Sequence, residues 1–331
     1  PGAQDLVDER ANYWLPVDYY VGGIEHAIMH LMYFRFYHKL MRDAGLVNSD
    51  EPAHNLLCQG MVIADTFYRT ESDGSKTWFN PADVLIENDE RGKITGATLI
   101  SDGQPVEIGG TEKMSKSKKN VVDPDTIIET YGADTARWFM LSDTPPERDI
   151  EWTSAGAEAS WRFVQRIWRL VNEAVHMEPS ASASSALRRA THKVIAAVTE
   201  DLEHLRFNRA IARIYELSNA LQAGLAAKDG AVREAADALV LLAAPMMPHL
   251  AEECWQVLGH TTPVVNTSWP KADPDLLVDD HVTMAIQVNG KRRDEIRVAK
   301  GSTREVLEPM VMVLESVKRA LDGKSVIKFI V

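Results

Sequence analysis

Cysteine is scarce in this chain of 331 residues, which holds only Cys58 and Cys254. Two cysteines so far apart exclude a disulfide framework and a zinc site built on a C-x-x-C motif, and they fit a reducing cytoplasm, where we expect the protein to act. No apolar run reaches membrane-spanning length, and the first residues lack the basic start and apolar stretch of a signal peptide. We therefore expect no membrane partner.

Positive charge is also in deficit, because 36 lysines and arginines face 48 acidic residues and leave a net charge of −12. This balance argues against a nucleic-acid coat protein, and we expect no DNA partner, although a local basic patch is enough to bind a nucleic acid. The pattern G-x-x-x-x-G-K-[ST] does not occur, which disfavours a P-loop kinase. The chain starts with proline rather than methionine, so we expect it to be a fragment or a processed product.

One dense cluster of positive charge stands out against that deficit, the sequence K-M-S-K-S at residues 113–117. A chance match in a chain of this length has a probability on the order of one in ten thousand. Lysine is a strongly hydrated point charge that suits phosphate. Met114 can anchor such a loop on an apolar surface, while Ser115 and Ser117 add hydroxyl donors. The loop therefore predicts displacement at a nucleotide phosphorus, where preplaced cations lower the barrier.

The region before the loop predicts half of a doubly wound nucleotide-binding fold. Residues 17–21 read as a short strand that ends at Gly22 and Gly23, and residues 24–43 read as a helix with apolar residues on most sides, which should be buried. Residues 56–63 predict a second strand. Ligands bind at the carboxyl ends of such strands, where glycines permit close backbone approach. A tight turn without a ligand is the plainer interpretation of the glycine pair.

The rest of the chain changes character three times. Turn clusters and short strands, such as residues 93–100, predict a β-rich insertion over residues 66–111. Two short helices should follow the loop, the first starting at Asp123-Pro124 and the second near Asp134. Residues 154–258 have a helical period and predict a bundle that is interrupted near residues 178–186 and 227–231.

The last fifty residues predict a compact α+β module. Asn289-Gly290 between two alternating stretches is a strong signal for a β-hairpin. The predicted elements are strands at residues 282–288 and 291–298, a helix at 303–321 and a final strand at 325–331.

The pentapeptide resembles the second signature of the class I aminoacyl-tRNA synthetases. Residues 13–45, 56–62 and 120–141 strengthen the match, and together they resemble leucyl-tRNA synthetases of the bacterial type over nearly the whole chain. The resemblance implies an α/β and α fold. Its parts would be the second half of a Rossmann-type catalytic domain at 1–65 and 112–153, a leucine-specific insertion at 66–111, an α-helical anticodon-binding-type domain at 154–270, and an α+β tRNA-binding module at 281–331.

The resemblance also implies a reaction. Such an enzyme condenses leucine and ATP to leucyl-adenylate and pyrophosphate, then transfers leucine to tRNA(Leu), and uses Mg²⁺ to neutralise phosphate charge. In the family, Lys116 would contact the ATP phosphates and stabilise the transition state, with Lys113 in support. Met114, Ser115 and Ser117 would complete the ATP-binding loop. A surface salt bridge is the ordinary alternative for either lysine.

Further ATP contacts are implied upstream of the loop. Gly23 and Glu25 match the family pattern of glycine, any residue and acid, in which the acid binds the adenosine ribose. An acid in the first turn of a helix also simply complements the helix dipole. Met61 and Val62 match a strand end where family members recognise adenine through backbone groups. A buried strand is the alternative there.

Two histidines and a basic turn complete the candidate residues. His26 and His30 lie four apart on one helical face, and the resemblance places them near the amino-acid pocket. Packed histidines are an equally ordinary interpretation, and a metal site is disfavoured because no third ligand is evident. Lys291, Arg292 and Arg293 form three adjacent cations at the predicted hairpin, where they would contact tRNA phosphates. A further set on one helical face, Arg162, Arg166 and Arg169, fits either tRNA phosphates or a solvated surface.

The sequence departs from the family in one important way. The other class signature, His-Ile-Gly-His or a close variant, is absent, and so is an editing domain. We therefore expect that this chain alone does not activate leucine and needs the missing N-terminal half, in cis or as a separate subunit. A sister enzyme for isoleucine, valine or methionine remains open. The alternatives from other classes are a non-catalytic tRNA-binding protein derived from a class I synthetase and a metal-dependent hydrolase that uses the two histidines.

Overall fold

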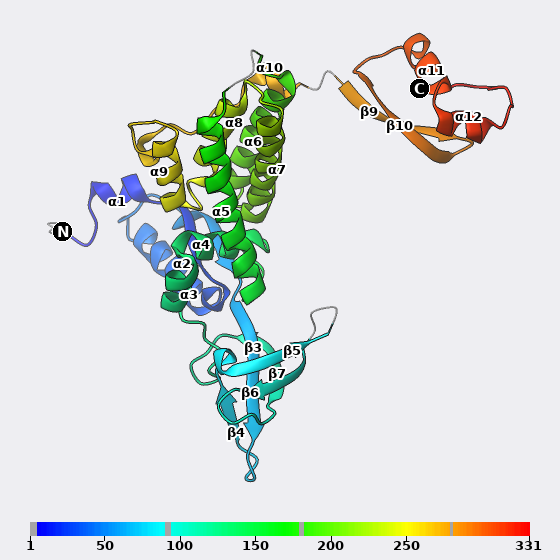
Figure 1. Cartoon of the computed structure of the whole chain (residues 1–331). Helices are drawn as coiled ribbons and strands as arrows, with labels where there is room; N and C mark the ends of the chain where they lie inside the picture. Colours follow the sequence, from blue (N-terminus) through cyan, green and yellow to red (C-terminus); the bar gives the residue numbers. More distant parts are fainter. Residues whose placement is uncertain (1–4, 90–93, 179–181, 279–280) are drawn as a thin grey trace. The chain divides into compact units, whose positions relative to one another are not determined.

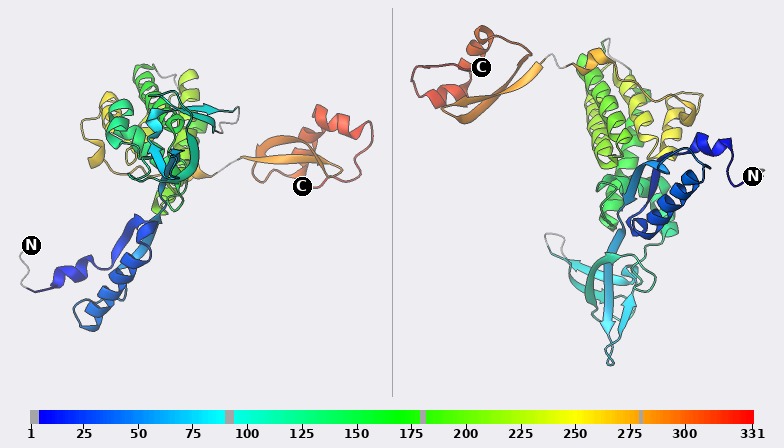
Figure 2. Two further views of the ribbon diagram at one scale, coloured as in Figure 1. Left: turned by 90° about the horizontal axis from the view of Figure 1, so that it is seen from below. Right: turned by 180° about the vertical axis from the view of Figure 1, so that it is seen from behind.

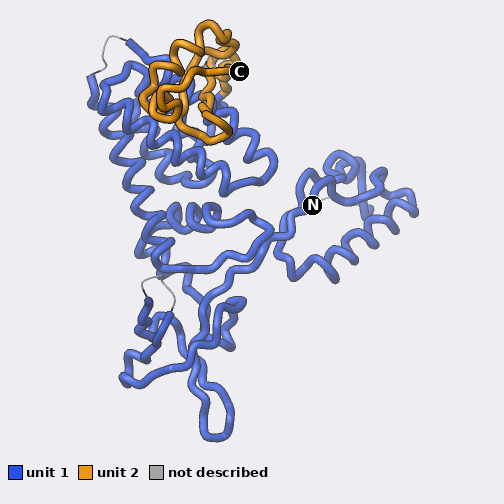
Figure 3. The backbone as a smooth tube through the Cα atoms, turned by 90° about the vertical axis from the view of Figure 1, so that its right-hand side faces the viewer, with its two compact units in different colours: residues 1–270 blue, residues 271–331 orange. Residues whose placement is uncertain are grey.

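The computed structural model describes residues 5–89, 94–178, 182–278 and 281–331. The chain divides into two compact units, residues 1–270 and 271–331, which Figure 3 draws in blue and orange. Within the described residues no helix is long and apolar enough to cross a membrane. The first residue of the predicted strand 93–100 lies outside the described residues, and the remainder belongs to β6 (Ile94–Leu99).

The first unit begins with a small parallel sheet. Its elements are α1 (Glu9–Trp14), β1 (Val17–Gly23), the 3₁₀ turn η1 (Ile24–His26), α2 (Met29–Asp43) and β2 (Ala53–Gln59). β1 pairs with β2 in parallel, and Gly22 and Gly23 lie opposite Cys58 and Gln59 at the carboxyl ends of both strands. The predicted strand and glycine pair are therefore confirmed, and a helix follows them in the order that a nucleotide-binding half requires.

The prediction of one buried helix over residues 24–43 is wrong. The segment divides into η1 and α2, and α2, all of which the structure describes, buries His38 alone. One face of α2 is held by polar contacts: Arg35 and Lys39 both pair with Glu51. An adjoining face carries an apolar stripe at helical spacing whose residues are each between 48% and 70% exposed. The stripe consists of Met29, Met32, Tyr33, Phe36, Tyr37 and Leu40.

The β-rich segment that follows is built around β3 (Val62–Thr70). β4 (Lys76–Phe79) and β7 (Glu107–Lys113) pair with β3 in antiparallel fashion, and β8 (Ile150–Glu151) pairs with it in parallel. The turn η2 (Pro81–Asp83) leads into an antiparallel hairpin of β5 (Val84–Asn88) and β6. The two sheets bury a common core of Phe67, Val84, Ala97, Leu99 and Val106, and Figure 1 shows β5 crossing over β3.

The predicted strand 56–63 spans a break between two sheets. Residues up to Gln59 belong to β2, whereas Val62 begins β3. A Cβ atom on Gly60 would lie 2.1 Å from the backbone of Arg148, and the Gly60 N–H donates to the Pro146 carbonyl over 2.9 Å. This close packing against a distant segment redirects the chain, and no local pattern records it.

The helical region follows the prediction closely. α3 (Pro124–Tyr131) starts with the Asp123 side chain accepting from the Asp125 N–H, and Gly132, at φ +85°, separates it from α4 (Ala133–Ser142). The bundle contains α5 (Ser154–His176), α6 (Ser185–Glu203), α7 (Phe207–Ala226), α8 (Val232–Ala243) and α9 (Pro248–Val257), and Figure 1 shows its long helices side by side. Both predicted interruptions lie between helices, although residues 179–181 of the first one are outside the described residues. The bundle core includes the fully buried Leu170, Ile214, Leu217, Leu221, Leu239 and Leu242.

The second unit is a two-stranded ribbon with helices (Figure 2). The turn η3 (Val264–Asn266) ends the first unit, and α10 (Pro274–Leu277) precedes β9 (His281–Val288) and β10 (Lys291–Ala299). The hairpin is confirmed, because Asn289 and Gly290 both have positive φ, as a type I′ turn requires. The predicted helix 303–321 is instead two, α11 (Arg304–Met312) and α12 (Glu315–Leu321), and residues 325–331 form no strand. The predicted fold class, α/β and α with a small α+β module, is confirmed by these elements.

Candidate functional site

The lysine loop connects β7 to α3. It leaves the sheet at Met114, whose N–H donates to the Val62 carbonyl over 3.2 Å. Residues 116–119 form a turn in which the Lys119 N–H donates to the Lys116 carbonyl over 3.4 Å. Lys119 itself has φ +54°, the left-handed region that non-glycine residues rarely adopt. The loop is therefore a defined turn at the edge of a sheet rather than an extended connection.

A single buried side chain, missed from the sequence, holds this turn. Asn120 is 0% exposed, and its Oδ1 accepts from the Ser115 N–H over 2.8 Å. Its Nδ2 donates to the carbonyls of Ala64 and Glu112 over 3.2 Å each, and the Lys113 carbonyl lies 3.4 Å away. The only local signal was a small polar residue between the lysine run and two valines, which is too common a pattern to single it out.

The lysines of the loop differ in their partners. The Lys118 ammonium is bound by the Glu112 carboxylate and lies 5.4 Å from the centre of the Trp78 ring. The Lys113 ammonium lies 3.7 Å from Oε1 of Glu25. Lys116 is exposed, and the described part of the chain offers it no ion pair. Of these three, Lys116 is therefore the cation best placed to meet an external phosphate.

The Lys113–Glu25 contact brings together two segments that the sequence interpretation assigned separately to ATP. Glu25 lies in η1, which follows the glycine pair, and its carboxylate folds back over Gly23, 2.2 Å from the place where a Cβ atom would stand. The space around Gly22 is open. The pKa of Glu25 is below its ordinary value of 4.5, first through a hydrogen bond from its own backbone N–H, then through the nearby positive charges of Lys113 and His26. The carboxylate is thus ionised at neutral pH.

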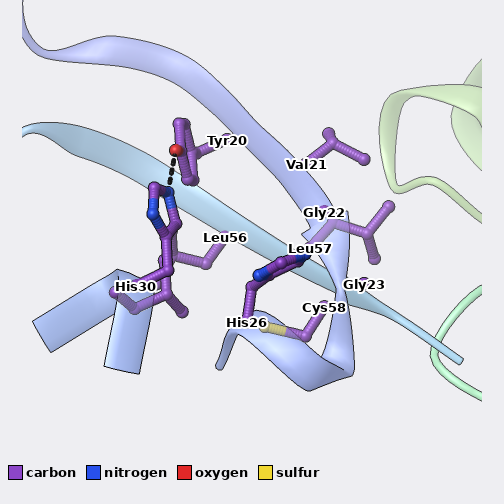
Figure 4. A pocket seen from close by; sticks show the side chains of 10 residues that line it. Tyr20, Val21, Gly22, Gly23, His26, His30, Leu56, Leu57 and Cys58 are labelled. Carbon is purple, nitrogen blue, oxygen red and sulfur yellow. Dashed lines mark hydrogen bonds between the residues drawn. The ribbon is translucent and has the colours of Figure 1, made fainter. Parts of the chain in front are cut away.

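A pocket of about 220 Å³ opens beside the glycine pair (Figure 4). His26 and His30 both line it, and the Tyr20 hydroxyl is hydrogen-bonded to Nε2 of His30. Tyr20, another residue missed from the sequence, also stacks on Phe34 with ring centres 4.2 Å apart. The remaining wall is mostly apolar and is formed by Val21, Leu31, Leu56, Leu57 and Cys58. The pocket therefore combines an apolar wall with two histidine side chains, one of which is oriented by the Tyr20 hydroxyl.

Met61 and Val62 lie at the start of β3, but their backbone groups are largely engaged. The Met61 N–H donates to Oδ1 of Asp149 over 2.7 Å, and its carbonyl accepts from the Ile150 N–H over 2.9 Å. The Val62 carbonyl is the acceptor for Met114. A ligand at this strand end would have to use the side chains or displace Asp149.

The described residues contain no group of three or more histidine, cysteine or acidic side chains arranged to hold a metal ion.

The predicted basic turn lies on the ribbon of the second unit. Lys291, Arg292 and Arg293 are all exposed, and Arg292 pairs with Glu295 over 2.6 Å. The pairing register shifts between Arg292 and Asp294, so Arg293 sits at a bulge. In the first unit, Arg162 and Arg169 pair with glutamates on their own helix, and Arg166 donates to Asn219 and Gln222. Internal partners therefore occupy that helical face.

Two family profiles match the chain. The profile described as "tRNA synthetases class I (I, L, M and V)" matches residues 61–153, and the one described as "Anticodon-binding domain of tRNA ligase" matches residues 185–308. The chain is 53% identical to the leucine–tRNA ligase of Parvibaculum lavamentivorans and 51% identical to that of Stenotrophomonas maltophilia. Each match covers 100% of the chain but only 39% of the relative, so the chain spans about two fifths of the length of these relatives.

Solved structures of aminoacyl-tRNA synthetases also match this chain. The agnB2 LeuRS of Agrobacterium radiobacter K84, solved as a ternary complex with tRNA and LeuAMS, matches with a TM-score of 0.68 and 27% identity over 96% of this chain and 37% of that one. A methionyl-tRNA synthetase of Mycobacterium tuberculosis bound to methionyl-adenylate matches with a TM-score of 0.53 over 78% of this chain and 48% of that one. Its identity is 16%, so it supports the fold alone.

Proposed function

Since this chain belongs to the leucine branch of the class I aminoacyl-tRNA synthetases, we propose that it supplies the lysine-loop half of the catalytic centre and tRNA-binding parts of a leucine–tRNA ligase. The complete enzyme activates leucine with ATP and transfers it to tRNA(Leu). The observation that carries the proposal is the 3.7 Å contact between Lys113 and Glu25, because it joins the lysine loop to the glycine edge.

In this proposal the phosphates of ATP bind to the lysine loop, and its ribose binds beside the glycine pair. Lys116, which has no carboxylate partner among the described residues, meets the phosphates and stabilises the charge that builds on them as leucine attacks. Lys113 leaves Glu25 to assist it, and the freed carboxylate accepts from the two ribose hydroxyls. Met114, Ser115 and Ser117 shape the loop. Mg²⁺ arrives with the phosphates, in keeping with the lack of a protein-built metal site in the described residues.

The amino-acid side chain is proposed to enter the pocket beside the glycine pair. Leu56, Leu57 and Val21 give it an apolar wall, and His30, oriented by Tyr20, closes one side next to His26. An apolar wall separates leucine from polar amino acids, but one methylene changes binding by only about 1–3 kcal/mol. Discrimination from isoleucine and valine therefore needs groups beyond this wall.

We further propose that the apolar stripe of α2 is covered by the N-terminal half of the enzyme, in cis or as a subunit. The relatives are more than twice as long as this chain, since it spans 39% of them. The stripe presents six large side chains on one face, whereas soluble proteins rarely leave such a patch open without a partner. With that half absent, the chain alone should not activate leucine.

The second unit is proposed to contact tRNA. Residues 281–331 hold ten lysines and arginines against six acidic residues, a net charge of +4 in a chain whose total is −12. Lys291 and Arg293, at the turn and the bulge, are the best-placed phosphate ligands. The two thiols, one of them buried at Cys254, fit the reducing cytoplasm as the place of action.

The experiment is an amino-acid-dependent pyrophosphate exchange assay on a chimera in which this chain replaces the matching region of the Parvibaculum lavamentivorans ligase. Exchange that depends on leucine supports the proposal, and exchange with isoleucine, valine or methionine instead would assign the site to a sister enzyme. The non-catalytic alternative predicts a chimera that is inactive but still binds tRNA. Titration of labelled tRNA(Leu) at rising salt identifies that outcome, because phosphate contacts weaken with salt.

A further inference from the structure

Four backbone groups, one inside the lysine loop and three on the strands that precede it, converge on one buried carboxamide. The acceptors of Asn120 are at the end of β7 and on the neighbouring strand β3, and its donor partner is the Ser115 N–H inside the loop. An asparagine side chain has two N–H donors and one carbonyl, and here each of them is engaged. Because Asn120 also begins the exit from the loop, one side chain fastens the entry, the interior and the exit of the turn.

We propose that Asn120 is the positioning residue of the lysine loop: it closes residues 115–119 into a ring and so fixes where Lys116 presents its ammonium. This rests on the proposed function of the loop, but it adds a residue and a role that the sequence did not supply. Lys116 follows Ser115 directly. Loss of the hydrogen bond from the Ser115 N–H to Asn120 therefore leaves the backbone of Lys116 free to move. Asn120 is completely buried and therefore acts through the loop, not through contact with substrate.

The strained turn shows why the loop needs such a fastening. Lys119 is held at φ +54°, and the neighbouring lysines repel one another in a short segment. Besides the Asn120 contacts, three hydrogen bonds lie within the described turn: the 3.4 Å Lys119–Lys116 bond, a 3.3 Å bond from the Lys118 N–H to the Ser115 hydroxyl, and a 3.3 Å bond between the Ser115 and Ser117 hydroxyls. All three are long for hydrogen bonds, and the ion pair of Lys118 with Glu112 holds a side chain rather than the backbone of the turn. A stable turn therefore depends on the buried carboxamide.

Two substitutions separate this role from simple packing. Asn120→Ala removes all four contacts. Asn120→Asp keeps the shape but replaces the donor by an acceptor that faces carbonyl oxygens, so it fails as a positioning group while still filling the volume. In the chimera both variants should lower kcat for pyrophosphate exchange by roughly 10- to 100-fold with the KM for leucine unchanged, because a misplaced catalytic group reduces the rate without touching the amino-acid pocket.

Thr66→Val is the matched control. Thr66 is also 0% exposed, and its hydroxyl donates to the Gly110 carbonyl over 2.8 Å on the same pair of strands. Its loss should lower stability in a similar way and leave kcat unchanged. If Thr66→Val reduces kcat as much as the Asn120 variants do, the effect is general destabilisation and the proposal is overturned.

Amide hydrogen exchange on this chain tests the geometry without any activity. In the unmodified chain the Ser115 amide should exchange roughly tenfold or more slowly than that of exposed Ser117, and Asn120→Ala should abolish the difference. Equal exchange at both serines before any substitution overturns the proposal, even if a variant fails to fold. An inactive chimera with protected Ser115 would instead reject the proposed function and leave the fastening of the loop intact.

Discussion

The helical bundle and the β1–α2–β2 region treat their large apolar side chains in opposite ways. In the bundle, residues such as Leu217 and Leu239 are completely buried by neighbouring helices. In α2, Phe36 and Tyr37 are each at least 60% exposed, although their spacing along the helix is just as regular. The bundle thus buries its apolar residues among its own helices, whereas α2 leaves an apolar face exposed, which we propose another part of the protein covers.

The residues that stabilise the fold and the residues proposed to act on ATP therefore lie in different regions. The groups proposed to act on ATP lie near the exposed stripe, on a loop and a strand end, while the bundle provides a well-buried core. Rigid scaffolds that carry functional groups on their loops are common in enzymes. Substitutions in the two regions should therefore have effects that do not overlap, which gives four ways to break or sharpen the comparison.

The largest effect is expected from Lys116→Ala in the chimera. Lys116 is proposed to stabilise the negative charge that develops on the phosphates, so its removal should lower the rate of pyrophosphate exchange by about 10²- to 10³-fold. The free energy of unfolding should stay unchanged. Lys118→Ala is the control, since it removes the same charge from the same loop but from an ammonium already bound by Glu112. Equal losses in the two variants would contradict the assignment of Lys116.

The next largest effect concerns the bundle. Leu239→Ala should lower the free energy of unfolding by about 3 kcal/mol, because it opens a cavity in a fully buried core. Leu40→Ala on the exposed face of α2 should change it by less than about 0.5 kcal/mol. Urea unfolding followed by tryptophan fluorescence compares the two. A large loss from Leu40→Ala would mean that the stripe is already covered within the chain.

An intermediate effect is expected when the stripe of α2 is made polar. Phe36→Ser should weaken binding of a separately expressed N-terminal portion by about 2 kcal/mol, the loss expected for one buried aromatic anchor. Glu51→Gln is the control on the adjoining polar face, where Arg35 and Lys39 hold the pKa of Glu51 at about 2 through hydrogen bonds. Titration calorimetry measures both. Unchanged affinity in Phe36→Ser would place the partner elsewhere.

The smallest effect concerns pH and the bundle. Burial raises the pKa of Asp229, but hydrogen bonds from Ser184 and Ala231 outweigh it and lower this pKa below 3.8. A lowered folded-state pKa stabilises the protein above pH 3.8, and that stability is lost as the pH falls through the folded value. Asp229→Asn should remove about 1 kcal/mol at pH 7 and flatten the stability profile below pH 4. The free energy of unfolding is measured from pH 7 to pH 3. The prediction is contradicted if its dependence on pH is the same in the variant and in the unmodified chain.

Local signals were readable from the sequence. The lysine loop, the glycine pair and the Asn289-Gly290 hairpin depend on a few adjacent residues, and all three lie where the patterns placed them. The Asp123 cap and the interruptions of the bundle were readable for the same reason.

Features set by distant contacts were not readable. The break at Gly60 depends on the backbone of Arg148, and the role of Asn120 depends on Ala64, more than fifty residues away. The exposure of α2 was missed because an apolar stripe has the same spacing whether or not its partner is in the chain. The last residues alternate like a strand, yet no described strand pairs with them.

The most direct test of the central claim is leucine-dependent pyrophosphate exchange by this chain alone and after addition of the N-terminal portion of the Parvibaculum lavamentivorans ligase. The account predicts no exchange by the chain alone and exchange in the mixture, because the lysine loop is present here and the other class signature is not. Exchange by the chain alone would contradict it, and so would a mixture that stays inactive although the two parts bind each other.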